Sequence, residues 1–435
     1  MRKTIKRCFL FVLIMTLFLS LTSCGQKKKE KVLTLRIANW EEYIDESVID
    51  DFQTWYEKKY HTKIKVEYST FGTNEDLYNQ LTIGDTFDIV CPSEYMIMKL
   101  MTEGKVQMFS DGFFDTGNKE NYYTNGVSKY IDQVFSNETI DGKSLKKYAA
   151  GYMWGTLGFV YNPKEISEAE VSDWNVLRNK KYRKKITTKD SVRDCYFAGL
   201  SMLNQDKLEG KSGKELQALL NDTSQKSVKQ VENVLTQMKD NVYSFETDSG
   251  KADMVTGKVA ANLQWSGDGV YSIQQAAEDN VQLKYAVPKA CTNIWFDGWC
   301  MLKNGINGNK EKQQAAEDFI NFISKPENVV KNMDYIGYTS TIAGNEDMTI
   351  YNYVKSLYED KKGNASYSLG YFFSGKEEDK RYVLQTTKKQ LNGELFAMYP
   401  TKEVINRAVV MEYFPKDADK RIRQMWTNIR CFSIK

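Results

Sequence analysis

The spacing of apolar residues along the chain predicts alternating strands and helices. Residues 32–37 form a short apolar run typical of a strand, and residues 64–68 alternate between apolar and polar positions as a half-buried strand does. Between them, apolar side chains over residues 48–56 recur at helical spacing, and Asp45 stands where it can cap that helix. A second amphipathic helix is predicted over residues 313–324, which end before a Lys-Pro pair. This order of elements is typical of an α/β protein.

Other predicted strands end at polar and aromatic residues. Residues 88–91 predict a buried strand that stops before a proline, so Ser93 and Tyr95 follow its carboxyl end. Open α/β sheets bind their ligands at this edge. Further strands are predicted over residues 258–263 and 283–287, and each leads toward a cluster that contains a tryptophan.

The composition is that of a soluble globular protein. The 435 residues are 41% hydrophobic and 27% charged, which excludes a disordered chain and a bundle of membrane helices. The formal net charge of +3 is close to balance, so we expect neither nucleic acid nor an anionic membrane surface as a partner. The charge of any ligand therefore has to be inferred from local clusters.

The first residues resemble a bacterial lipoprotein signal. A basic start over residues 2–7 is followed by an apolar run over residues 9–20, and then by Leu-Thr-Ser-Cys, which ends at Cys24. The resemblance to a lipobox implies a signal peptide over residues 1–23, a lipid on the Cys24 sulfur and a tether over residues 24–32. It also implies a protein anchored to the outer face of the bacterial cell membrane, or a periplasmic one. A plain signal anchor or a cleaved secretory peptide is the alternative.

Metal and redox motifs are missing from the sequence. The only histidine is His61, and none of the seven cysteines stands in a Cys-x-x-Cys pair. We therefore expect no metal and no cofactor. Nucleophilic catalysis would need His61 as its base, and no catalytic motif surrounds that residue. We expect a binding protein and not an enzyme, and a glycoside hydrolase that uses paired carboxylates is the remaining enzymatic alternative.

Four short clusters combine aromatic and acidic residues. They are Trp40-Glu41-Glu42-Tyr43, Pro92-Ser93-Glu94-Tyr95, Trp265-Ser266-Gly267-Asp268 and Trp295-Phe296-Asp297. Carboxylates attract ammonium groups, and aromatic faces pack against methylene groups and attract cations. Clusters that are dispersed in the sequence and convergent in space predict a cleft that binds a small polycation.

The order of these motifs resembles that of the spermidine/putrescine-binding proteins of bacterial ABC importers. The motifs that carry the resemblance are Asn39-Trp40, Glu42-Tyr43, Asp88-Ile89-Val90, Pro92-Ser93, Tyr95, Arg193-Asp194, Trp265 with Gly267, Trp295 with Asp297, and Ile336-Gly337-Tyr338. The resemblance implies a two-lobed α/β solute-binding fold of class II, with discontinuous lobes and a central ligand cleft. It also implies a monomer that captures a polyamine and delivers it to the membrane permease and ATPase of an importer.

The resemblance also implies a division of the chain. Lobe 1 is expected over residues 33–152 and 298–397, and lobe 2 over residues 153–297 and 398–435. The stretch over residues 345–396 is longer than the usual connection of the family and rich in tyrosine, phenylalanine and charged residues. We interpret it as an accessory insertion in lobe 1.

Several residues match ligand-contacting or cleft positions of the family. They are Trp40, Glu42, Tyr43, Ser93 and Tyr95 on the wall of lobe 1, followed by Asp194, Trp265, Trp295, Asp297 and Tyr338. The resemblance implies that Glu42, Asp194 and Asp297 accept the amine hydrogens while the aromatic rings flank the alkyl chain. Such carboxylates are needed because moving an unpaired ammonium from water into a water-poor cleft costs several kcal/mol.

Four positions depart from the family pattern. Asp268 stands where the spermidine binder has a small hydroxyl residue, and it matches an aspartate of putrescine-preferring relatives, which favours a shorter diamine. Glu41 replaces a threonine or serine, and Ser191 replaces a carboxylate. Glu412 is the nearest counterpart of a late glutamine that contacts the ligand in the family. The choice between putrescine and spermidine stays open.

The predicted site residues also have structural interpretations. The tryptophans could be core residues, and Asp268 and Asp297 could cap turns beside glycines. Asp194 could be a surface partner of Arg193, and Ser93 could be a helix N-cap. A receptor of the same fold for thiamine, an opine, an aminophosphonate or ferric iron is the functional alternative.

Overall fold

The computed structural model describes residues 32–208, 210–344 and 348–431. The predicted signal peptide, Cys24 and most of the predicted tether lie outside the described residues. Across the part that is described, no helix is both long enough and apolar enough to cross a membrane.

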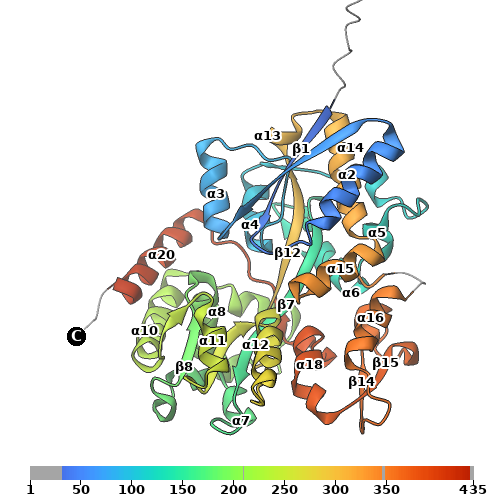
Figure 1. Cartoon of the computed structure of the whole chain (residues 1–435). Helices are drawn as coiled ribbons and strands as arrows, with labels where there is room; N and C mark the ends of the chain where they lie inside the picture. The colour runs from blue at the N-terminus through green and yellow to red at the C-terminus, as the bar shows by residue number, and fades with distance from the viewer. Residues whose placement is uncertain (1–31, 209, 345–347, 432–435) are drawn as a thin grey trace, which may run out of the picture.

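Two lobes share one mixed sheet (Figure 1). The strand order is β2-β1-β3-β12-β7-β10-β8-β9. In that order the strands span Lys63–Phe71, Val32–Trp40, Ile89–Val90, Thr292–Leu302, Ala150–Tyr161, Ala261–Trp265, Ile186–Lys189 and Phe245–Glu246. Strands β2, β1 and β3 lie in lobe 1, at the top of Figure 1, and β10, β8 and β9 lie in lobe 2, at the bottom. The predicted two-lobed α/β fold is confirmed.

The long strands β7 and β12 connect the two lobes. Strand β12 pairs with β16 (Ala408–Val409) at its start, with β7 along its middle, and with β3 and β4 (Val106–Gln107) at its end. The register of β12 against β7 shifts between Asp297 and Gly298. A bulge of this kind bends a strand and redirects its side chains. It lies where the chain passes from one lobe to the other.

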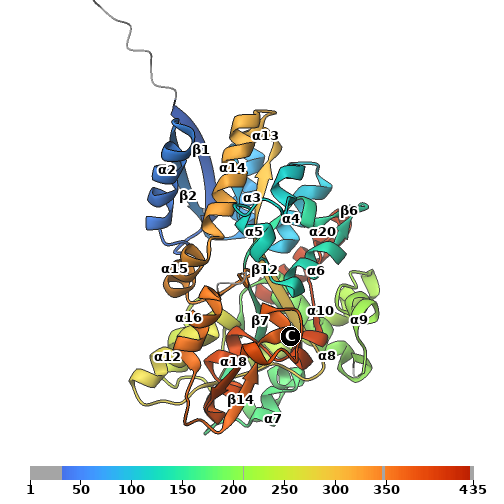
Figure 2. The same ribbon diagram turned by 90° about the vertical axis from the view of Figure 1, so that its right-hand side faces the viewer.

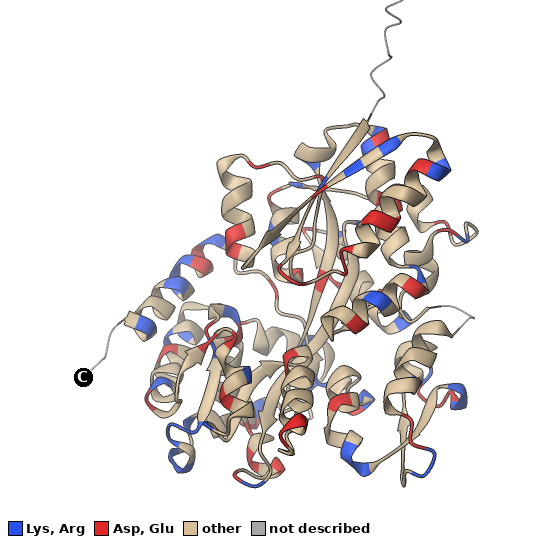
Figure 3. Ribbon diagram, viewed as in Figure 1, with Lys and Arg blue, Asp and Glu red and all other residues tan. Residues whose placement is uncertain are grey.

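Helices cover both lobes. In lobe 1 they are α2 (Ser47–Tyr60), α3 (Asn74–Ile83), α4 (Glu94–Thr102), α5 (Tyr122–Gly126), α6 (Lys129–Asn137), α13 (Lys303–Ile306), α14 (Lys310–Ile323) and α15 (Pro326–Ile336). In lobe 2 they are α7 (Glu168–Val171), α8 (Val192–Leu208), α9 (Gly213–Leu220), α10 (Gln225–Asn241), α11 (Ser249–Val255), α12 (Ser266–Glu278), α19 (Lys402–Asn406) and α20 (Lys416–Cys431). Acidic and basic residues are mixed over both lobes, in agreement with the balanced net charge (Figure 3).

Most of the predicted elements are present, with shifted ends. Helix α2 covers the predicted segment and begins at Ser47, whose N–H donates to Asp45 Oδ1 at 2.9 Å. The second predicted helix lies within α14, and the strand expected from residue 258 begins at Ala261. Strand β11 (Lys284–Ala286) agrees with prediction, but Trp295 belongs to β12, which the sequence pattern missed. All residues of β12 are buried, so the strand shows no alternation of apolar and polar positions.

The predicted insertion contacts both lobes (Figure 2). Its elements are α16 (Thr349–Tyr358), β14 (Ala365–Ser368), α17 (Gly370–Phe373), β15 (Val383–Thr386) and α18 (Glu394–Met398). Helix α16 packs against α15 and α17 against α6, whereas α18 packs against α12 of lobe 2. The Phe372 ring is fully buried and stacks on Trp154, with ring centroids 5.5 Å apart. The segment therefore contributes to the core, and the division of the chain at the predicted residues stays a prediction.

Candidate functional site

A buried carboxylate, Asp297, stands at the junction of the two lobes. It is the last residue of β12 before the register shift in the pairing with β7, which lies between Asp297 and Gly298. The Tyr43 hydroxyl donates to Asp297 Oδ2 at 2.8 Å, and the Ser93 hydroxyl donates to Oδ1 at 2.8 Å. Ser93 occupies the N-cap position of α4, but its side chain makes no capping hydrogen bond. The structure therefore uses the Ser93 hydroxyl to hold Asp297.

The environment of Asp297 is short of positive charge. Burial raises the pKa of this carboxyl to about 6, although the hydrogen bonds from Tyr43 and Ser93 lower it. Both donors are neutral hydroxyls. A carboxylate that is 7% exposed and held only by neutral donors is stabilised by an added cation.

Aromatic rings surround this carboxylate. Trp295 and Asp297 are two positions apart in β12 and share one face of the strand. The Tyr338 ring lies beside both Trp295 and Tyr43, with ring centroids 5.6 Å apart in each pair. We call Tyr43, Ser93, Trp295, Asp297 and Tyr338 the Asp297 end of the predicted cleft. It combines a carboxylate held by two neutral hydroxyls with the rings of Tyr43, Trp295 and Tyr338.

A second group forms around Asp268, in the first turn of α12. Tyr338 OH donates to Asp268 Oδ1 at 2.9 Å, and Lys189 Nζ lies 3.2 Å from Oδ2. The same Lys189 Nζ lies 4.5 Å from the centroid of the Trp265 ring, and Trp265 Nε1 donates to Asp194 Oδ1 at 3.4 Å. We call Lys189, Asp194, Trp265 and Asp268 the Asp268 end of the cleft. Tyr338 joins it to the Asp297 end.

Asp194 and its neighbour Arg193 are both buried, which excludes a surface ion pair. The Arg193 guanidinium lies 4.2 Å from the centroids of both the Tyr95 and Phe414 rings, and it donates to the backbone carbonyl of Glu412. Burial lowers the pKa of Arg193 and raises that of Asp194. One face of Tyr95, a predicted ligand wall, is therefore covered by a cation of the protein itself. The side chain of Glu412 is exposed.

The first predicted cluster is only partly joined to this group. Glu41 and Glu42 are exposed, and Glu42 adopts a left-handed backbone conformation with φ of 51°. The Trp40 ring is half-buried and packs against Phe71, with ring centroids 4.8 Å apart. Of this cluster, Tyr43 is the residue that contacts Asp297.

Sequence reasoning missed three residues of the site. Asn74 Nδ2 donates to Tyr95 OH at 2.9 Å and to Ser93 Oγ at 3.1 Å, so it positions both. Glu94 lies inside a predicted cluster, yet it was not selected; burial raises its pKa to about 8. Lys189 is the last residue of strand β8. From the sequence alone, a lysine at such a position is expected on the surface.

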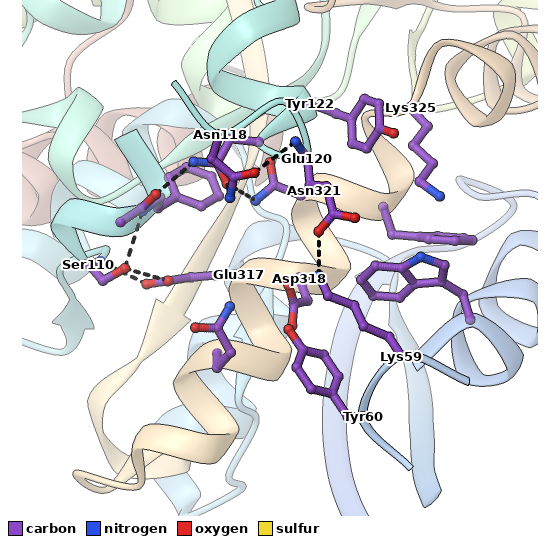
Figure 4. Close-up of a pocket in the computed structure, with 16 residues that line it drawn as sticks. Lys59, Tyr60, Ser110, Asn118, Glu120, Tyr122, Glu317, Asp318, Asn321 and Lys325 are labelled. Atoms are coloured by element: carbon purple, nitrogen blue, oxygen red, sulfur yellow. Dashed lines mark hydrogen bonds and ion pairs between the residues drawn. The ribbon is translucent and has the colours of Figure 1, made fainter. Parts of the chain in front are cut away.

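A cavity of about 300 Å³ lies elsewhere, within lobe 1 (Figure 4). It lies between α2, α14 and the segment around α5, and no predicted site residue lines it. Two of its acidic groups face a lysine, since Lys59 Nζ lies 2.8 Å from Glu120 and 3.8 Å from Asp318, and the third, Glu317, accepts hydrogen bonds from the backbone N–H and hydroxyl of Ser110. The cavity and the tryptophan-aspartate residues are thus in different places. Asp297, in contrast, makes no ion pair with any described residue, which makes the latter group the candidate ligand site.

No metal cluster is found in residues 32–208, 210–344 and 348–431, where no three His, Cys, Asp or Glu side chains are grouped to hold an ion.

Comparisons with known proteins agree with this geometry. The family model of bacterial extracellular solute-binding proteins matches residues 48–352. The chain is 26% identical over 307 residues to the spermidine/putrescine-binding periplasmic protein of Salmonella typhimurium, covering 70% of this chain and 76% of that protein. It is 26% identical over 337 residues to the putrescine-binding periplasmic protein SpuD of Pseudomonas aeruginosa, covering 75% and 83% of the two chains.

A solved structure matches almost the whole chain. It is that of the spermidine/putrescine ABC transporter substrate-binding protein PotD from Streptococcus pneumoniae, with a TM-score of 0.61 and 25% sequence identity. The match covers 92% of this chain and 98% of that one. The two-lobed arrangement around strands β7 and β12 is therefore shared with a protein of known architecture.

Proposed function

The chain belongs to the bacterial extracellular solute-binding proteins, and we propose from this that it captures a polyamine, putrescine or spermidine, for an ABC importer. The observation that carries the proposal is Asp297. It is a buried carboxylate held by two neutral hydroxyls and bordered by three aromatic rings. An ammonium group supplies the missing charge, and the rings accommodate the methylene groups beside it.

The second ammonium of a diamine needs another acceptor. Asp194, whose pKa is raised by burial, and Glu42, at the exposed turn after β1, are the acceptors that we propose for it. Putrescine has six heavy atoms, and a ceiling of about 1.5 kcal/mol per atom allows about 9 kcal/mol of binding free energy. This corresponds to a Kd of about 1 μM or somewhat below.

Contacts between the lobes support a closure mechanism. Tyr338, which follows α15 of lobe 1, donates to Asp268 of lobe 2, and Arg193 of lobe 2 covers Tyr95 of lobe 1. Both contacts break if the lobes rotate apart about β7 and β12. We propose that ligand entry requires this opening and that the ligand stabilises the closed arrangement.

Location and partners follow from the relatives. The matched proteins of Salmonella typhimurium and Pseudomonas aeruginosa are periplasmic, and we propose an extracytoplasmic location for this chain. We also propose that Cys24 carries a lipid, that the protein acts as a monomer, and that it delivers its ligand to a permease and an ATPase. Because the relatives are solute-binding proteins, we propose binding without turnover.

Calorimetric titration tests the proposed ligand. Protein that lacks residues 1–24 is unfolded, stripped of bound amines, refolded, and titrated with putrescine, spermidine, spermine and cadaverine. We expect one-to-one binding with a Kd of about 1 μM or lower for at least one of them. Absence of heat from folded protein with all four would reject a polyamine receptor. A thermal-shift panel with thiamine, an opine, an aminophosphonate and ferric iron with carbonate would then identify another solute of this fold.

A further inference from the structure

An ammonium of the protein itself occupies part of the cleft. The Lys189 side chain is 1% exposed, and its Nζ donates to the Thr247 carbonyl at 2.8 Å and to Asp268 Oδ2 at 3.2 Å. Glu246 Oε1 lies 3.7 Å away, and the Trp265 ring centroid lies 4.5 Å away. Two carboxylates, a carbonyl and an indole face are the partners that a buried ligand ammonium needs.

Cations of the protein already face Asp268 without a ligand. Asp268 and Glu246 supply two negative charges, and Lys189 supplies one positive charge between them. Lys251 Nζ lies 3.7 Å from Asp268 Oδ1, and it also lies 3.5 Å from Oδ1 of the exposed Asp248. Asp268 also accepts a hydrogen bond from Tyr338, so both of its carboxylate oxygens have partners within the protein.

Asp297 differs from Asp268 in the charge of its partners. Its oxygens accept hydrogen bonds from the hydroxyls of Tyr43 and Ser93, and neither donor carries a charge. The two aspartates therefore differ in whether a cation of the protein lies beside them. One is neutralised by a lysine of the chain, and the other is left for a ligand cation.

We propose that Lys189 is a specificity-determining residue, whose ammonium fills the place of one ligand ammonium at Asp268 and Trp265. The inference rests on the proposed polyamine function. A diamine whose acceptors are Asp297 and Glu42 avoids Asp194, which lies with Lys189 at the Asp268 end. A triamine that reached Asp268 would bring a like charge close to Lys189 Nζ. Two like charges about 5 Å apart near a protein surface lower affinity by roughly a hundredfold. The cleft therefore selects putrescine over spermidine.

The test compares two amines on three proteins. Kd values for putrescine and spermidine are measured by calorimetry for the wild type, for Lys189→Met and for Lys251→Met. Methionine keeps the length and apolar stem of the lysine and removes its charge. Lys251 is the matched control because its Nζ also faces Asp268, but its side chain is 28% exposed and its Nζ lies over the Tyr271 ring instead of the Trp265 ring.

We expect the wild type to bind putrescine at least about tenfold more tightly than spermidine. Lys189→Met should change this ratio at least about tenfold in favour of spermidine, and Lys251→Met should change it less than about threefold. An unchanged ratio in folded Lys189→Met would overturn the inference. If that variant does not fold, the wild type decides, since equal or tighter binding of spermidine also overturns it. Absence of binding by both amines would instead reject the proposed function.

Discussion

Replacing Asp297 by asparagine tests the proposed site most directly. Asparagine keeps the shape of the side chain and can still contact Tyr43 and Ser93, which both lie 2.8 Å from the carboxylate in the wild type. The change removes the only charge at the Asp297 end. A buried ion that loses its partner costs about 3–5 kcal/mol. We therefore expect Asp297→Asn to raise the Kd of the preferred polyamine by a factor of roughly a hundred to several thousand, as measured by calorimetry.

The pH dependence gives an independent check of the same carboxylate. Burial raises the pKa of Asp297 to about 6, so the group is mostly ionised at pH 7 and about one-tenth ionised at pH 5. The ligand cation needs the ionised form. Affinity should therefore be retained above pH 6 and fall by about tenfold between pH 7 and pH 5. Glu94, which faces Asp297 and whose pKa burial raises to about 8, is already mostly protonated across this range.

The control is Asp318→Asn. Asp318 is also a buried aspartate of lobe 1 whose pKa is raised by burial, but it lies at the cavity of Figure 4. This variant should keep the wild-type Kd and the wild-type pH dependence, whereas Asp297→Asn should lose the pH dependence. A Kd of Asp297→Asn within about threefold of the wild type, which is less than 1 kcal/mol, would refute the assignment of the ligand ammonium to Asp297.

Three further changes follow from the same geometry. Tyr43→Phe removes a hydrogen bond that lowers the pKa of Asp297; calorimetry across pH should show the midpoint move above 6 and the Kd rise by roughly three- to tenfold. Gly267→Ala would place a Cβ against the Tyr338 ring of the other lobe, so titration should show at least about tenfold weaker binding with little change in Tm. Phe372→Ala removes a fully buried ring of the insertion; denaturant unfolding should show a loss of about 3–5 kcal/mol, with the Kd of the folded protein unchanged.

Much of the site was predictable because its residues are local to recognisable elements. Ser93 follows a buried strand at the edge where α/β sheets bind ligands, and it contacts Asp297 as part of the predicted cleft. Trp295 and Asp297 are two positions apart, and in a strand this spacing places both on one face. The relation between these segments could not come from spacing, since 204 positions separate Ser93 from Asp297. Only the resemblance to a family predicted that these segments lie close together in the folded chain.

The buried contacts of basic residues were not predictable in this way. A lysine is almost never fully buried, so Lys189 at the end of β8 gave no signal of its own. Its partners Asp268 and Glu246 lie 79 and 57 positions away, on other elements. The insertion was underestimated for a related reason. Its aromatic residues are mixed with many charges in the sequence, and only the folded chain places Phe372 against Trp154.

The comparison of Asp268 with Asp297 shows where inference from family motifs needs the structure. By residue type, both aspartates stand beside a tryptophan and a glycine, and both match acidic positions of polyamine binders. What separates them is a cationic donor, because each aspartate also accepts a hydrogen bond from a tyrosine hydroxyl. Asp268 has the ammonium of Lys189 at 3.2 Å, whereas Asp297 has two neutral hydroxyls at 2.8 Å and a pKa raised to about 6. A motif match predicts which side chain stands at a position, but it does not predict which charged groups of the protein lie beside that side chain. We therefore expect the ligand charge to be set by Asp297, which makes no ion pair among the described residues.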